Sequence, residues 1–149
     1  MIKIGEKAPE INSIDQNGEK ITLKQFIGKK IILYFYPKDM TPGCTAQSCN
    51  LRDNYRLLLE RGYVVLGCSA DSPSRHIKFI DKYDLPFPLI SDESKQVLKD
   101  YGVWGLKKFM GKEYMGIIRT TFLIDENGII EDIINKVKTK EHTSQILNS

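Results

Sequence analysis

This 149-residue sequence contains only three cysteines, little excess charge and no long apolar run. Its longest unbroken apolar run covers residues 31–36, far fewer than the roughly 20 residues that a membrane-spanning helix requires. The first residues, MIKIGEKAPEINS, have neither the apolar core nor the small-residue cleavage site of a secretory signal peptide. We therefore expect a protein that stays in the cytoplasm and contacts no membrane.

The charge is also nearly balanced, because 22 basic and 19 acidic residues are mixed along the chain and leave a net charge of +3. Nucleic-acid binding draws much of its affinity from clustered cations, so this mixture gives it little support. We interpret Lys107, Lys108 and Lys112 as solvated residues of a loop. No nucleic-acid partner is expected.

No feature of the sequence indicates a boundary between domains. It has no internal repeat, no low-complexity segment and no long linker of Pro, Gly or Ser. A chain of this length, 41% hydrophobic, can bury one core of useful size. We expect residues 1–149 to form a single domain.

Short apolar stretches alternate with helical patterns along the sequence. Strands are expected on both sides of Asn17-Gly18, over 30–36, 63–70 and 87–92, and on both sides of Asn127-Gly128. Helices are expected from Cys44 to a glycine cap at Gly62, from Asp71-Ser72-Pro73 onward, over 93–101 and from about Lys140. The segment 103–118 shows no clear period and is interpreted as a covering loop.

This order of elements predicts an α/β fold. Parallel strands need helical crossovers, whereas the final hairpin must be antiparallel, so the central sheet should be mixed. The expected architecture is a thioredoxin-like three-layer α/β/α sandwich with an N-terminal hairpin.

Cys44 follows a pattern that favours the start of a helix. Threonine is a good cap residue, and proline is favoured at the next position because its missing N–H would be unpaired there. Cys44 would then be the third helical residue, near unpaired N–H groups and the positive end of the helix dipole. Both favour a thiolate, the nucleophilic form of cysteine.

The second cysteine of this stretch lies five residues later, at Cys49. On an intact helix the Cα atoms of such a pair are about 8.5 Å apart and point about 140° away from each other. A disulfide requires a Cα separation below about 7 Å. We hypothesise that Cys44 and Cys49 can pair only if the first turns of the helix unwind.

Cysteine and histidine have other common roles in proteins. Both thiols of the stretch could be small core residues, and Cys68, at the end of an apolar strand, is expected to be one. The spacing of cysteines and histidines gives little support to a metal site, and no metal or other cofactor is expected. His76 and His142 are interpreted as surface side chains, and no hydrolase or nucleotide-binding motif is present.

The stretch YPKDMTPGCTAQSCNLRD, residues 36–53, resembles the active-site segment of the peroxiredoxins, in particular the bacterioferritin comigratory protein or peroxiredoxin Q group. The family pattern Pro-x-x-x-Thr-x-x-Cys matches at Pro37, Thr41 and Cys44. Residues 91–130 are also similar to this group, including the arginine at Arg119 before Thr-Thr-Phe-Leu-Ile-Asp. With Gly5, Ala8 and Pro9, the resemblance extends over nearly the whole chain.

This resemblance implies a thiol-dependent peroxidase. Cys44 would attack a hydroperoxide and become a sulfenic acid, Cys49 would condense with it to a disulfide, and a dithiol donor such as thioredoxin would restore both thiols. Arg119 would stabilise negative charge, Thr41 would offer its hydroxyl to the sulfur or the peroxide, and Pro37 would shield the site. The resemblance also implies hydrogen peroxide and organic hydroperoxides as substrates.

The sequence departs from the typical two-cysteine peroxiredoxins in two respects. It lacks their C-terminal resolving cysteine and their Gly-Gly-Leu-Gly element, so we expect a monomer without disulfides between subunits. Two other function classes stay open: a thioredoxin-like disulfide exchange protein or peroxide sensor, and a binding protein with structural thiols. The absence of a Cys-x-x-Cys pair counts against disulfide exchange.

Overall fold

Two strands of mostly apolar residues lie side by side at the centre of the molecule. In the computed structural model, which describes residues 2–148, β3 (Lys30–Phe35) pairs in parallel with β4 (Tyr63–Ser69). Strands buried on both faces need apolar residues at successive positions, which explains why these two show no alternation. The parallel strands β3 and β4 direct their carboxyl ends toward the same edge of the sheet.

Five further strands complete this sheet in the order β2-β1-β5-β4-β3-β8-β9. β5 is parallel to β4, whereas the β1–β2 hairpin and the β8–β9 hairpin are antiparallel to their neighbours. Their bounds are β1 (Asn12–Ile14), β2 (Lys20–Thr22), β5 (Leu89–Ser91), β8 (Thr120–Ile124) and β9 (Ile130–Ile134). The mixed sheet and the N-terminal hairpin are thus confirmed.

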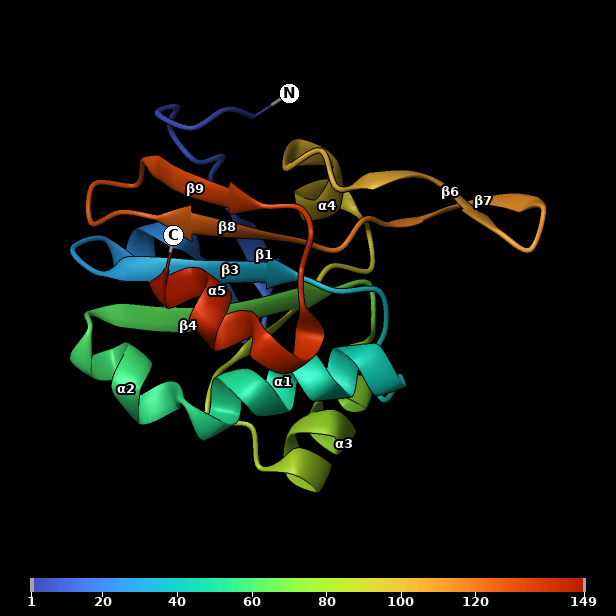
Figure 1. The fold of residues 1–149 in the computed structure, drawn as a ribbon, viewed down its shortest axis with the longest axis horizontal. Coiled ribbons are helices and arrows are strands. Elements are labelled where there is room, and N and C mark those ends of the chain that lie inside the picture. The colour runs from blue at the N-terminus through green and yellow to red at the C-terminus, as the bar shows by residue number, and fades with distance from the viewer. Residues whose placement is uncertain (1, 149) are drawn as a thin grey trace.

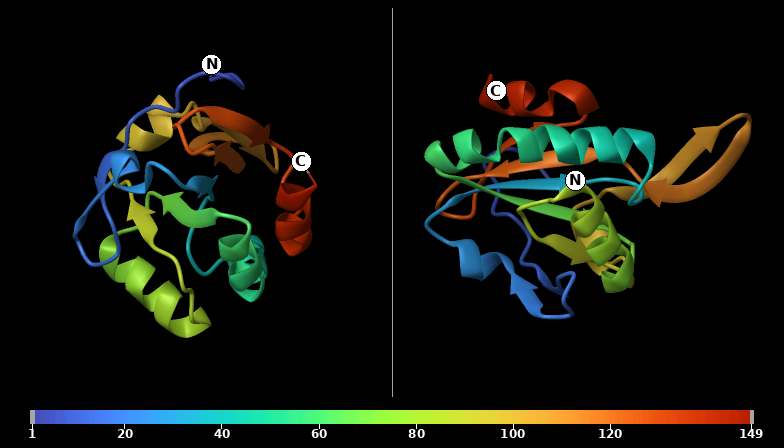
Figure 2. Two further views of the ribbon diagram at one scale, coloured as in Figure 1. Left: turned by 90° about the vertical axis from the view of Figure 1, so that its left-hand side faces the viewer. Right: turned by 90° about the horizontal axis from the view of Figure 1, so that it is seen from below.

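Helices cover both faces of this sheet (Figures 1 and 2). One face packs against α1 (Pro42–Asp53), α2 (Tyr55–Glu60), α3 (Pro73–Tyr83) and α5 (His142–Leu147), which supply Leu51, Leu58, Phe79 and Ile146 to one buried cluster. The other face packs against α4 (Gln96–Asp100), the N-terminal segment and the short helix η1 (Leu23–Phe26). A further short helix, η2 (Thr139–Glu141), precedes α5. The three-layer arrangement is confirmed.

The helix expected from Cys44 to Gly62 is interrupted at Asn54, which separates α1 from α2. Asn54 has φ −111° and ψ 12°, and its side-chain amide donates to the Asn50 carbonyl at 2.8 Å. Asparagine competes for backbone hydrogen bonds in this way, and it is therefore a poor residue for a helix interior. The helix expected over 93–101 is also shorter, because Lys95, with φ 67°, precedes its first residue.

The segment 103–118 is not a loop, so that prediction is wrong. It forms an antiparallel hairpin of β6 (Trp104–Phe109) and β7 (Lys112–Ile117), which projects from the body of the molecule (Figure 1). Met110 and Gly111 both have positive φ, as a two-residue hairpin turn requires. Most of its residues are exposed, so the sequence carries no pattern of buried positions.

Between residues 2 and 148, no helix has the length and apolarity needed to span a membrane.

Candidate active site

Cys44 lies at the amino end of α1, immediately after the loop that follows β3. Thr41 has the extended backbone conformation of a cap residue, Pro42 is the first helical residue and Cys44 is the third. The helix start is therefore confirmed. The Thr41 hydroxyl, however, donates to the Lys38 carbonyl at 2.8 Å and not to the sulfur, so it stabilises the loop and leaves its oxygen able to accept a hydrogen bond.

The Cys44 side chain is fully buried and contacts a cation from a distant part of the chain. Arg119, between β7 and β8, directs Nη2 to the Cys44 sulfur at 3.3 Å. A side chain at Gly43 would place its Cβ 3.3 Å from the same Nη2, so glycine leaves room for the guanidinium. A guanidinium and a helix amino terminus both favour negative charge on sulfur.

Gln47 is a site residue that the sequence analysis missed. It lies one turn after Cys44, and its Oε1 accepts a hydrogen bond from Arg119 Nη1 at 2.6 Å. One end of the guanidinium is thus held by an amide while the other end faces the sulfur. Gln47 is buried, and its Nε2 has no hydrogen-bond partner within the described part of the chain. The spacing of one helical turn from Cys44 is the signal that could have indicated it.

Cys49 lies on the same helix and is half-buried. Burial raises the pKa of its thiol, and the Arg52 cation offsets part of this effect. Cys44 and Cys49 are both free thiols on an intact α1, so helix geometry keeps them apart. Next to Cys49, the Ser48 hydroxyl lies 2.9 Å from the Tyr34 hydroxyl of β3, which fastens this part of α1 to the sheet.

Pro37 follows β3 and is half-buried beside a hollow of about 390 Å³. Trp104 at the base of the β6–β7 hairpin lines the same hollow, as do Tyr114 and Met115 farther along β7. The charged residues Lys38, Asp71 and Lys107 complete its lining. The structure therefore places the apolar side chains of the hairpin beside the loop that leads to Cys44. All five residues expected at the site, Pro37, Thr41, Cys44, Cys49 and Arg119, lie on this loop, on α1 or against it.

The carboxyl end of α1 is held by the C-terminal segment. Asn50 donates through its side chain to the Lys140 carbonyl at 2.9 Å and accepts from the Thr143 backbone N–H at 2.8 Å. Arg52 donates to the Tyr83 carbonyl, at the end of α3, at 2.7 Å. The part of α1 beyond Cys49 is thus fastened to three other helices, η2, α5 and α3.

The third cysteine and the two histidines are all buried. Cys68 lies in the core on the other face of the sheet, and burial raises the pKa of its thiol, as expected of an apolar substitute. The expectation that His76 and His142 lie at the surface is wrong, since both are fully buried. Burial is possible because both ring nitrogens of each histidine have hydrogen-bond partners.

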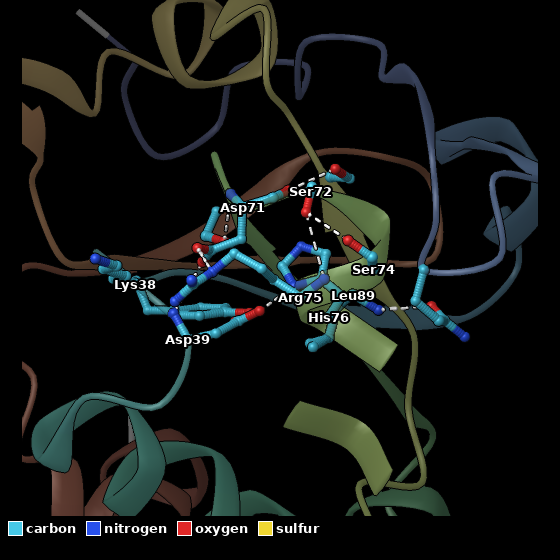
Figure 3. A network of polar contacts seen from close by, with 12 residues as sticks. Lys38, Asp39, Asp71, Ser72, Ser74, Arg75, His76 and Leu89 are labelled. Carbon is cyan, nitrogen blue, oxygen red and sulfur yellow. Dashed lines mark hydrogen bonds and ion pairs between the residues drawn. The ribbon is translucent and has the colours of Figure 1, made fainter. Parts of the chain in front are cut away.

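Asp39, Asp71 and His76 form a group that by residue type and proximity could hold a metal ion, since their ligand atoms lie within 4.8 Å of one another. Each carboxylate oxygen and each ring nitrogen of this group is already hydrogen-bonded to the protein (Figure 3). These bonds would have to break before a metal could bind.

The comparisons with known proteins agree with this geometry. The family model described as the AhpC/TSA family matches residues 4–133. Peroxiredoxin Bcp of Escherichia coli strain K12 is 48% identical over 147 residues, which cover 99% of this chain and 94% of the relative. Peroxiredoxin Bcp of Bacillus subtilis strain 168 is 46% identical over 148 residues, with the same two shares.

Solved structures show the same fold. The PrxQ of Xylella fastidiosa superposes with a TM-score of 0.93 at 29% identity, covering 99% of this chain and 94% of that one. The bacterioferritin comigratory protein of Xanthomonas campestris, studied for its alkyl peroxide reduction activity, gives a TM-score of 0.86 at 32% identity, with 93% and 88% covered. The thioredoxin-like architecture is confirmed. This chain belongs to the AhpC/TSA family and, within it, to the Bcp and PrxQ peroxiredoxins, which are thiol-dependent peroxidases.

Proposed function

We propose that Cys44 is the peroxidatic thiol of this peroxidase. The observation that carries the proposal is the contact of Arg119 Nη2 with the buried Cys44 sulfur at a helix amino terminus. The thiolate attacks the terminal oxygen of a hydroperoxide, and the O–O bond breaks. Cysteine becomes a sulfenic acid, while the leaving oxygen takes up a proton and departs as water or an alcohol. Arg119 stabilises the negative charge that passes from sulfur to the leaving oxygen.

Thr41 and Pro37 are proposed to assist this step from the preceding loop. The Thr41 oxygen, whose own hydrogen goes to Lys38, can accept the hydrogen of the hydroperoxide and so orient it. Pro37 shields the site from stray water. The apolar side chains of the hollow beside Pro37, such as Trp104 and Met115, can contact the organic part of an alkyl hydroperoxide, the substrate class studied with the Xanthomonas relative.

Cys49 is proposed as the resolving thiol. Its sulfur attacks the Cys44 sulfenic acid, an S–S bond forms and water leaves. The raised pKa of Cys49 keeps it in the thiol form before this step, so it does not compete with Cys44 for peroxide. A dithiol protein such as thioredoxin then reduces the disulfide by thiol–disulfide exchange and is itself oxidised.

The condensation requires α1 to unwind between the two cysteines. This unwinding breaks the Arg119–Gln47 hydrogen bond and the Tyr34–Ser48 contact, both between Cys44 and Cys49. The anchors at Asn50 and Arg52 lie beyond Cys49 and need not break. We propose that the oxidised protein is unwound over 44–49 only.

The experiment that tests the function is peroxide consumption coupled to thioredoxin and thioredoxin reductase. Cys44→Ser should show no turnover. Cys49→Ser should consume one equivalent of peroxide and stop at a sulfenic acid, which dimedone traps and mass spectrometry detects. Full turnover by Cys44→Ser would overturn the assignment, and oxidation of a partner protein without peroxide turnover would favour the disulfide exchange protein or sensor.

We further propose that residues 1–149 act as a single-domain monomer in the cytoplasm. The position of Cys49 on the same helix as Cys44 supports the monomer, because no second subunit is needed for resolution. Light scattering after size exclusion and cell fractionation test the two statements, and a single cooperative unfolding transition tests the domain count.

A further inference from the structure

A buried pair of opposite ionisable side chains lies behind the loop that leads to Cys44. Asp39, in this loop, is 1% exposed, and His76, on α3, is fully buried. His76 Nδ1 lies 2.7 Å from Asp39 Oδ2, across 37 residues of chain (Figure 3). Burying two such groups costs free energy unless their hydrogen bonds are made. We therefore expect the pair to have a structural or functional role.

The hydrogen bonds of the pair account for its protons. His76 Nε2 lies 3.0 Å from the Ile90 carbonyl oxygen, which can only accept, so Nε2 carries a hydrogen. One further hydrogen must lie between Nδ1 and Asp39 Oδ2. Whichever atom holds this hydrogen, the net charge of the pair is zero. The His76 ring is hydrogen-bonded on one side to Asp39 of the loop and on the other side to Ile90 of β5.

The Asp39 residue is held at two more points. Its Oδ1 accepts from the Tyr36 hydroxyl at 2.6 Å, and its backbone N–H donates to Asp71 Oδ2 at 2.8 Å. Asp71 is itself fixed by Ser69 Oγ at 2.7 Å and by Arg75 Nε at 3.0 Å. These contacts connect the loop to the ends of β3 and β4 and to the first turn of α3.

The loop needs such support because its backbone is strained. Met40 has φ 69°, a region that residues with a side chain rarely adopt and that costs about 1 kcal/mol or more. This residue stands between Asp39 and the cap residue Thr41. The direction in which the chain enters α1 therefore depends on how firmly Asp39 is held.

We propose that Asp39 and His76 are a positioning pair for the peroxidase reaction: His76 holds the Asp39 carboxylate, and Asp39 fixes the loop that sets Pro37 and Thr41 beside Cys44. The pair touches neither peroxide nor sulfur and acts through the loop. The proposal rests on the peroxidatic role of Cys44 given above.

The test compares two reactions of the same sulfur. Reaction with hydrogen peroxide needs the loop to orient the peroxide, whereas alkylation by iodoacetamide does not. The quantity measured is the ratio of the two second-order rate constants, in the full chain with Cys49→Ser as background. Asp39→Asn and His76→Gln should each lower this ratio about tenfold or more, since small misplacements of reacting groups are costly.

The variant that carries both Asp39→Asn and His76→Gln should have the same ratio as the single variant with the lower ratio, because the two residues act as one unit. Asp81→Asn, at an exposed position on the same helix, is the matched control and should leave the ratio unchanged. Where a variant of the buried pair does not fold, Tyr36→Phe carries the test. It removes only the hydroxyl that donates to Asp39 and should lower the ratio several-fold.

An unchanged ratio in every folded variant would overturn the proposal, and so would additive losses in the double variant. A parallel fall of both rate constants would also overturn it, since this is the result of a general loss of structure. The failure of the proposed function itself is distinguishable, because Cys44 of the background protein would then react with iodoacetamide and not with peroxide.

Discussion

Arg119 Nη2 lies 3.3 Å from the Cys44 sulfur although 75 residues of chain separate the two. The contact joins the strand β8, which Arg119 precedes, to the amino end of α1. Because β8 pairs with β3 and β3 leads into the active-site loop, the sheet itself fixes this distance. The cation is thus positioned from the sheet, while the thiol lies on a helix that we propose unwinds during resolution.

Loss of the Arg119 guanidinium should slow the first oxidation strongly. We expect Arg119→Met to lower the rate constant of Cys44 with hydrogen peroxide about 10²-fold or more, the loss typical of a removed oxyanion donor. Rapid mixing with peroxide measures this rate. Arg56→Met, at a side chain 95% exposed, is the control and should react like the wild type. A loss below about threefold would show that Arg119 does not act on the reacting atoms.

Gln47→Glu should also slow this reaction, although it changes only an amide to a carboxylate. The new carboxylate would accept the Arg119 hydrogen bond as an ion pair and compete with the Cys44 thiolate for the same cation. We expect a lower rate constant of Cys44 with hydrogen peroxide, measured by rapid mixing. If this rate constant does not change, Gln47 does not control the guanidinium.

The Asn50 anchor should limit how far α1 unwinds on oxidation. In the oxidised wild type, amide hydrogen exchange should become fast over 44–49 and stay slow at Leu51, Arg52 and Asp53. Asn50→Ala removes the bonds to Lys140 and Thr143, so fast exchange should spread to these residues. Asn135→Ala, an exposed asparagine, should change nothing. Equal exchange in the two oxidised proteins would contradict the anchor.

Acid should destabilise the docking of α5 through His142. Burial lowers the pKa of this imidazole, which contacts Thr121 and Gln145. The unfolded state therefore binds a proton that the folded state resists, and stability falls as the pH drops below the unfolded pKa of about 6.5. The contribution is at most about 1.4 kcal/mol per pH unit.

Thermal unfolding between pH 7.5 and 5 measures this effect. His142→Gln, which keeps a polar side chain without the titration, should flatten the dependence of Tm on pH in this window. An identical slope in the two proteins would mean that His142 contributes nothing to it.

The parts of the site that carry a local sequence pattern or a family motif could be predicted, whereas Gln47 and the contact between Asp39 and His76 could not. The helix start at Cys44 follows from the Thr-Pro-Gly order, and Arg119 follows from the family resemblance. The Asp39–His76 contact spans 37 residues and leaves no periodic signal in the sequence. A histidine among polar helix residues is usually exposed, so only the tertiary structure shows the partner that allows its burial.

The fold shows the same division. The central strands are apolar at successive positions and were predictable, because both of their faces are buried. The β6–β7 hairpin has two largely exposed faces, so no alternation of apolar residues marks it. The helix breaks at Asn54, where one side-chain hydrogen bond reaches the Asn50 carbonyl. Helix propensity summed over the whole segment does not show such a local break.

The two buried cores of this protein keep its two fully buried cysteines apart. Cys44 packs in the core under α1, whereas Cys68 packs in the core on the opposite face of the sheet. A sulfenic acid formed at Cys44 therefore cannot meet Cys68 unless the sheet itself comes apart. The central sheet is thus a barrier between Cys68 and the thiol that we propose is oxidised. Cys49, on the same helix as Cys44, is left as the proposed internal partner.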